Sequence, residues 1–162
     1  MIIGNGDLAK VITDKEDCIF FASGVSNSLE NRLTEFEREY NLLMAQDKSK
    51  RLVYFSSLSI YYKESDYTNH KLFMEFVIKK HFAKYCIIRL GNITWGENPN
   101  TIINYFKKKI KESEIPEIQD GYRYVCTQYE FNHWLNLIPK FNTEMNITGS
   151  LTSIRDLYSS LT

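Results

Sequence analysis

The segment RLVYFSSLSIYY, residues 51–62, decides the fold of this chain. It opens with an apolar run of strand length, Arg51–Phe55, and a cluster of serines, Ser56–Ser59, follows directly. A helical pattern then runs from about Tyr67 to Lys84, and a second strand of the buried type covers Cys86–Leu90. A strand, a helix and a strand in this order predict a βαβ unit, and hence parallel pairing.

The same alternation of short apolar runs and helical patterns extends toward both ends of the chain. It predicts an α/β fold with a short, mostly parallel sheet that is covered on both faces. We expect ligands at the carboxyl ends of the strands, because the Gly, Ser and Asn clusters fall there. The other expected strands cover residues 1–3, 18–22 and 122–126, and the other expected helices cover 7–13, 29–46, 101–111, 129–137 and 153–161.

Two of these helices indicate which residues should face the core. The helix over 29–46 has one apolar face, and its glutamates and arginines lie opposite, on what we expect to be a solvated face. The apolar face comprises Leu29, Leu33, Phe36, Tyr40, Leu43 and Met44. In the helix that begins at Tyr67, Leu72, Phe76 and Ile78 are expected to face the core.

Length and charge limit the classes of function. A chain of 162 residues has room for one core, so we expect a single domain. Lys and Arg number 20 against 20 Asp and Glu, and no basic stripe is present. Nucleic acids and anionic membranes bind clustered Lys and Arg, so neither partner is expected. Small molecules or proteins remain as partners.

The cysteines and histidines suggest no metal centre. Cys18, Cys86 and Cys126 lie far apart, each inside an apolar run, which is typical of reduced core thiols and favours a cytoplasmic location. Neither an export signal nor a membrane-spanning run is visible in the sequence. The histidines at positions 70, 81 and 133 lack metal-ligand spacing, and His70 is expected at the surface.

A glycine turn follows the first strand. Gly4, Gly6 and Ala9 form a G-x-G-x-x-A pattern between a strand and a helix. Such glycines permit a tight turn and let backbone N–H groups approach a diphosphate, and the alanine lets helix and strand pack closely. The same residues can also serve backbone geometry alone, so the pattern leaves both interpretations open.

The second motif pairs a tyrosine with a lysine one helical turn later. Tyr67 and Lys71 share a helix face, so the ammonium group can favour the phenolate and make Tyr67 usable as an acid or base. A hydroxyl of Ser57 or Ser59 can hydrogen-bond the same substrate oxygen. The alternative is coincidence, because the chain has 11 tyrosines and serines are common in turns.

These motifs stand in an order that resembles the extended short-chain dehydrogenase/reductases, the family of sugar-nucleotide epimerases and dehydratases. The resemblance covers the serine segment, the Tyr-x-x-x-Lys helix with the following Glu75, and the glycine turn. It also covers the strand ends at 21–24 and 88–96 and, near the C-terminus, residues 146–157.

The resemblance implies a role for each matching position. Tyr67 would be the general acid/base, Lys71 would assist it and hold the cofactor ribose, and Ser57 or Ser59 would bind the substrate oxygen. The cofactor, NAD or NADP, would exchange a hydride with a nucleotide sugar. Its expected contacts are Gly4, Gly6 and Ala9 at the diphosphate, Ala22, Ser23 and Gly24 at the next strand end, and Lys71, Arg89 and Asn92 near the nicotinamide and substrate.

The chain departs from the family in length. Few residues separate Ala9 from the strand at Cys18, so the family's second and third strands, which hold the adenine, are expected to be missing. Glu30 has the spacing of the family's ribose-binding acid, but it lies at the opening of the expected helix and not at a strand tip, so we take that match as coincidence. The prediction is a truncated Rossmann-like three-layer sandwich over 1–162, with a reduced C-terminal lobe formed by remnants of the substrate lobe at about 97–120 and 140–162.

Two principal functions fit this pattern. One is an epimerase, dehydratase or reductase of bacterial surface-polysaccharide synthesis, with a partner subunit that completes the adenine side. The other is a non-catalytic module that binds a sugar nucleotide or a protein, with weak or no dinucleotide binding; a pure interaction protein is a third possibility. In the family the helices over 29–46 and 67–84 pair across a two-fold axis, so the resemblance also implies a homodimer.

Overall fold

A parallel five-stranded sheet forms the centre of the computed structural model, which describes residues 1–162. The strand order is β1-β2-β3-β4-β7, and every neighbouring pair is parallel. The predicted α/β fold with a short, mostly parallel sheet is therefore confirmed. The strands are β1 (Ile2–Ile3), β2 (Cys18–Phe21), β3 (Arg51–Ser57), β4 (Tyr85–Leu90) and β7 (Thr143–Ile147).

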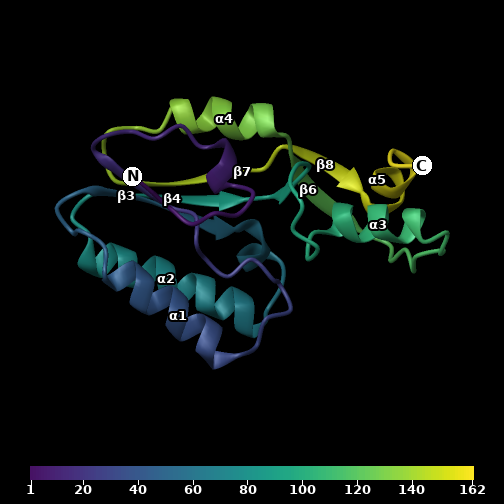
Figure 1. Cartoon of the computed structure of the whole chain (residues 1–162), viewed down its shortest axis with the longest axis horizontal. Coiled ribbons are helices and arrows are strands. Elements are labelled where there is room, and N and C mark those ends of the chain that lie inside the picture. The colour runs from purple at the N-terminus through teal and green to yellow at the C-terminus, as the bar shows by residue number, and fades with distance from the viewer.

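Helices cover both faces of this main sheet, as Figure 1 shows. On one face lie α1 (Leu33–Met44) and α2 (Asp66–His81), and on the other lie α4 (Gln128–Asn136) and the 3-10 turn η1 (Ala9–Val11). The strands β3 and β4 are buried on both faces because their side chains alternate between the two helical layers. Val53 and Phe55 pack toward Phe131 of α4, whereas Leu52 and Tyr54 pack toward Met74 of α2.

Polar side chains cap the starts of α2 and α4. Ser65 and Thr68 form a capping box at the start of α2, and Thr127 and Glu130 form another at the start of α4. A short 3-10 turn, η2 (Leu58–Tyr61), joins β3 to the segment before α2. The serine cluster is therefore held between a central strand and a turn.

A smaller lobe lies beside the carboxyl end of the main sheet (Figure 1). Its three strands have the order β5-β6-β8, with β5 and β6 parallel and β6 and β8 antiparallel. The elements of this small lobe are β5 (Asn92–Ile93), α3 (Ile102–Lys111), β6 (Tyr122–Cys126), β8 (Ser150–Ser153) and α5 (Ile154–Ser159). Its own core gathers Ile103, Phe106, Val125, Ile154 and Leu157.

The chain crosses between the main sheet and the small lobe three times: after β4, after β6 and after β7. The crossings meet at two glycines. A Cβ at Gly91 would lie 2.8 Å from the Tyr124 carbonyl oxygen, and a Cβ at Gly149, where φ is +64°, would lie 2.1 Å from the Val125 carbonyl oxygen. Only glycine lets the three backbones approach this closely.

The opposite edge of the main sheet ends at β1, which pairs only with β2. Residues 12–17 alone connect η1 to β2, so no strand follows the glycine turn before β2. The short helix expected over 7–13 forms only the 3-10 turn η1. None of the helices combines the length and the apolar character that crossing a membrane would require.

The inner faces of α1 and α2 differ from the prediction. Leu29 precedes α1 and is 77% exposed, and Leu33 is 67% exposed. On α2, Ile78 is buried as expected, but Leu72 and Phe76 are exposed. The physical reason is that α2 turns a partly polar face, which includes Thr68, His70, Lys71 and Glu75, toward the interior.

Candidate functional site

A cavity of about 640 Å³ opens at the carboxyl ends of β2, β3 and β4. Its walls come from five parts of the chain: the glycine turn, the end of β2 with the residues after it, Arg38 of α1, the serine cluster with α2, and the residues after β4. Most of the residues singled out from the sequence line it. They are Gly6, Ala22, Ser23, Gly24, Ser57, Ser59, Tyr67, Lys71 and Asn92.

The glycine turn brings free backbone donors to the cavity. Gly4 has φ of +121°, and a Cβ there would lie 2.5 Å from the Ala22 carbonyl oxygen, so this position requires glycine. At Gly6 the space beside the backbone is open. The backbone N–H groups of Gly6, Asp7 and Leu8 have no acceptor within the protein. A run of unpaired N–H groups beside open space fits a phosphate group.

The serine cluster forms the floor of the cavity beside β3. Ser57 donates to the Ser59 Oγ at 2.9 Å, and the Ser59 N–H donates back to the Ser57 Oγ at 3.1 Å. The Oγ of Ser56 is buried and has no hydrogen-bond partner, although Ser56 also lines the cavity.

Tyr67 and Lys71 both face inward from the first two turns of α2. Tyr67 is 7% exposed and Lys71 is 2% exposed. The Lys71 Nζ lies 5.7 Å from the centre of the Tyr67 ring. The four-residue spacing therefore places the ammonium group beside the ring, on the shared helix face that the sequence predicted.

A buried glutamate on α1 binds the ammonium group of Lys71. The Lys71 Nζ lies 3.1 Å from one oxygen of Glu39 and 3.3 Å from the other, and it donates to the Tyr54 hydroxyl at 3.1 Å. Glu39 also accepts from Tyr54 at 2.6 Å and from the Val25 N–H at 2.7 Å, and its Oε2 lies 3.0 Å from the His70 Nε2.

Electrostatics keep this buried carboxylate charged. Burial alone would raise the pKa of Glu39, but the charge of Lys71 and hydrogen bonds from His70, Tyr54 and Val25 outweigh it and lower the pKa to about 2. Burial and the neighbouring carboxylate raise the pKa of Tyr54 well above its ordinary value. At neutral pH the cluster therefore holds an ion pair and a neutral phenol.

Two sequence predictions are wrong at this cluster. His70 was expected at the surface, but it is buried and stacks on Phe36 with ring centres 4.4 Å apart. Glu39 was expected on the solvated face of its helix, but it has no exposed surface. Its spacing gave a signal: Glu39 lies three residues after Phe36 and four before Leu43, on the face that packs inward.

Three of the expected cofactor contacts lie outside the cavity wall. Gly4 and Ala9 lie at either end of the glycine turn, and neither lines the cavity. Arg89 does not line it either, and binds Glu75, Glu144 and the Tyr61 hydroxyl. These bonds hold the guanidinium group away from the cavity. The catalytic candidates Ser57, Ser59, Tyr67 and Lys71 therefore line the cavity, but the expected cofactor contact Arg89 does not.

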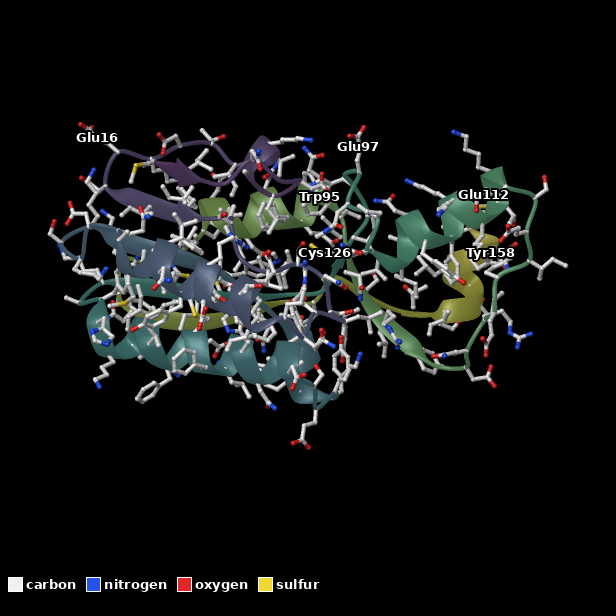
Figure 2. All side chains as sticks on the ribbon, turned by 60° about the horizontal axis from the view of Figure 1, so that its bottom comes forward. Glu16, Trp95, Glu97, Glu112, Cys126 and Tyr158 are labelled. Carbon is white, nitrogen blue, oxygen red and sulfur yellow. The ribbon has the colours of Figure 1, made fainter.

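A strap of residues 95–101 closes the cavity on the side of the small lobe. Asp7 accepts hydrogen bonds from the Glu97 N–H at 3.1 Å and the Asn98 N–H at 2.9 Å. The Trp95 indole donates to the Asp7 carbonyl at 3.3 Å. Figure 2 shows Trp95 and Cys126 at the junction of the main sheet and the small lobe. The sequence motifs gave no indication of this strap, of which residues 98–101 line the cavity.

Comparisons with known proteins identify structures with a similar fold. No family model matches the sequence, and no curated protein is similar to it in sequence. Solved structures do match. The Bordetella bronchiseptica enzyme WbmG, in complex with NAD and UDP, has a TM-score of 0.70 and 16% identity, over 90% of this chain and 55% of WbmG.

Two further structures extend the comparison. The UDP-glucose 4-epimerase of Thermus thermophilus, in complex with NAD, has a TM-score of 0.65 and 14% identity over 90% of this chain and 60% of the epimerase. The dTDP-glucose 4,6-dehydratase of Bacillus anthracis has a TM-score of 0.69 and 12% identity over 90% of this chain and 55% of the dehydratase. This chain therefore shares a Rossmann-like fold with these structures. It spans only a little over half the length of these structures.

Proposed function

We propose that this chain is an NAD(P)-dependent sugar-nucleotide epimerase, dehydratase or reductase that acts in bacterial surface-polysaccharide synthesis. The observation that carries the proposal is the convergence of Ser57, Ser59, Tyr67, Lys71 and the glycine turn on one cavity. The solved structures of similar fold include a UDP-glucose 4-epimerase and a dTDP-glucose 4,6-dehydratase. A cytoplasmic location fits the three free thiols.

Different residues of the cavity would contact the two ends of the cofactor. The unpaired N–H groups of the glycine turn and the segment Ala22–Gly24 would hold the cofactor diphosphate, and Lys71 and Asn92 would lie toward its nicotinamide end. A bound nicotinamide would supply the hydride acceptor or donor. No strand lies beyond β1 to hold an adenine, so affinity for the cofactor should be modest.

The proton chemistry would fall to three side chains. Tyr67, as the phenolate, would take a proton from a hydroxyl of the sugar as a hydride leaves its carbon, and the resulting phenol would return the proton in the reverse step. Ser57 or Ser59 would donate a hydrogen bond to the same oxygen and hold it in place. The positive charge of Lys71 beside the Tyr67 ring would stabilise the phenolate.

A second candidate is a non-catalytic module that binds a sugar nucleotide or a protein. Two observations favour it: the main sheet ends at β1, and the ammonium group of Lys71 is bound to Glu39 within the protein. In this case Tyr67 and Lys71 would be remnants of an enzyme, and dinucleotide binding would be weak or absent.

We also propose that the protein forms a homodimer through α1 and α2. Their outer faces expose the large apolar side chains of Leu33, Phe73 and Phe76. A groove between the two helices is lined by Leu33, Phe36, Tyr40 and Phe73 together with polar residues. Exposed apolar surface of this kind is typical of a protein interface.

A cofactor titration tests the proposed function. We expect NADH or NADPH at millimolar concentration to raise the melting temperature of the protein, because a ligand that binds only the folded state stabilises it. With UDP-glucose or dTDP-glucose as substrate and NAD(P)+ present, wild type should turn over the sugar, and Tyr67→Phe should lose that activity. Tyr129→Phe is the matched control, since Tyr129 is 80% exposed on α4.

The two candidates give different outcomes. Absence of both a heat signal and a melting shift with either cofactor would refute the enzyme. Binding of a UDP-sugar without turnover, unchanged in Tyr67→Phe, would identify the binding module.

A further inference from the structure

The partner of Lys71 is the least expected feature of the candidate site. Glu39 comes from α1, outside every motif that points to the cavity, and it has no exposed surface. A buried ion pair is poor evidence for a purely stabilising role, because apolar side chains of similar volume stabilise a core at least as well. A charged pair in the wall of a cavity therefore calls for a functional explanation.

Four residues from three parts of the fold hold Glu39 in place. Its carboxylate bonds to Val25 after β2, Tyr54 on β3, and His70 and Lys71 on α2. Both oxygens accept at least two hydrogen bonds, so the carboxylate has little freedom to rotate. A rigid carboxylate can in turn fix the position of a lysine, whose side chain is otherwise flexible.

Lys71 lines the cavity, whereas its partner Glu39 does not. A Cβ at Gly24 would lie only 2.8 Å from the Lys71 Nζ. The acceptors of its hydrogen bonds within the protein are Glu39 and Tyr54, and neither the glycine turn nor Tyr67 takes one. The pair is therefore built so that Glu39 fixes Lys71 while Lys71 itself remains at the cavity.

We propose that Glu39 is a positioning residue that holds the ammonium group of Lys71 at the cavity wall, ready for a nicotinamide cofactor. The inference rests on the proposed function, and it adds a residue that acts through Lys71 without touching the ligand. Preorganisation of this kind removes the cost of ordering a long side chain when the ligand binds.

A double-mutant cycle on cofactor affinity tests the role. NADH and NADPH are titrated calorimetrically into wild type, Glu39→Gln, Lys71→Met and the double variant, and melting curves show which variants are folded. Glu39→Gln should weaken binding about tenfold, which is the loss expected for a disturbed charge-assisted hydrogen bond. The double variant should bind as weakly as Lys71→Met and no more weakly, because Glu39 acts only through Lys71.

The control is Glu37→Gln, the same change on the exposed side of α1, which should leave affinity unchanged. If Glu39→Gln does not fold, cofactor affinity can still be compared between Lys71→Met and the double variant, because the double variant contains no unpaired buried lysine. Equal affinities of these two variants would support the inference. Unchanged or tighter binding by Glu39→Gln would overturn the inference, as would a double variant weaker than Lys71→Met. Wild type that binds neither cofactor would overturn the proposed function itself, and this inference with it.

Discussion

At the scale of single residues, Gly24 lies against the buried Lys71–Glu39 pair without room for a side chain. A Cβ there would lie 2.8 Å from the Lys71 Nζ and 2.9 Å from a Glu39 oxygen. Both side chains are fully buried and bonded to each other, so neither can move aside freely. We therefore expect Gly24→Ala to lower the free energy of unfolding by about 1–3 kcal/mol, as overpacking does elsewhere, measured by urea denaturation.

Gly6→Ala is the matched control for Gly24→Ala. No atom lies within 4 Å of a Cβ built at Gly6, so the substitution should change the free energy of unfolding by less than about 0.5 kcal/mol. Equal losses in the two variants would contradict the argument from packing and would point to backbone flexibility instead.

Some contacts of the site could be predicted from the sequence, and others could not. Tyr67 and Lys71 were predictable because their spacing alone puts them on one helix face. The partnership of Lys71 with Glu39 was not, because it depends on how α1 packs against α2, and two helices far apart in sequence carry no local signal of their contact. Arg89 failed to reach the cavity for the same reason: Glu75 and Glu144 bind it on the sheet surface.

At the scale of elements, the strap of residues 95–101 depends on one side chain of the glycine turn. Asp7 accepts the backbone N–H groups of Glu97 and Asn98 with a single carboxylate oxygen. We expect Asp7→Ala to speed hydrogen exchange at these two amides about tenfold or more, and to cost about 1–2 kcal/mol of stability. Hydrogen exchange followed by NMR or mass spectrometry measures both the local exchange rates and the loss of stability.

Asp47→Ala provides the comparison for the strap. Asp47 accepts hydrogen bonds only from Ser49 in its own turn, so its removal should leave exchange in the strap unchanged. The dependence on Asp7 would be disproved if the amides of Glu97 and Asn98 exchanged at the wild-type rate in Asp7→Ala.

The elements themselves were predictable where burial is complete. The strands β3 and β4 read as continuous apolar runs because both of their faces are covered. The strand β7 was missed: it lies at the edge of the main sheet, and its sequence, TEMNI, alternates buried or half-buried side chains with exposed ones. Such a short half-polar segment is hard to distinguish from a loop without knowledge of its neighbour.

At the scale of the whole molecule, the exposed apolar residues of α1 and α2 predict association. We expect light scattering to give about twice the chain mass of 19.1 kDa, and Phe73→Glu to return the protein to the mass of one chain. The reason is that a charge placed in an apolar interface is costly to bury.

Leu151→Glu is the control for the dimer prediction, since Leu151 is 58% exposed on β8, away from both helices. Leu151→Glu should leave the mass measured by light scattering at that of the dimer. A single-chain mass for the wild type would exclude this interface.

The three crossings between the main sheet and the small lobe interleave the two parts along the chain. Each part draws its strands from separate stretches of the chain, and the crossings meet where Gly91 and Gly149 lie against β6. No single cut can therefore release an intact main sheet from an intact small lobe. A cut in residues 112–121, for example, would divide both cores between the two fragments. Such a cut would also separate the strap, of which residues 98–101 line the cavity, from β6 and β7.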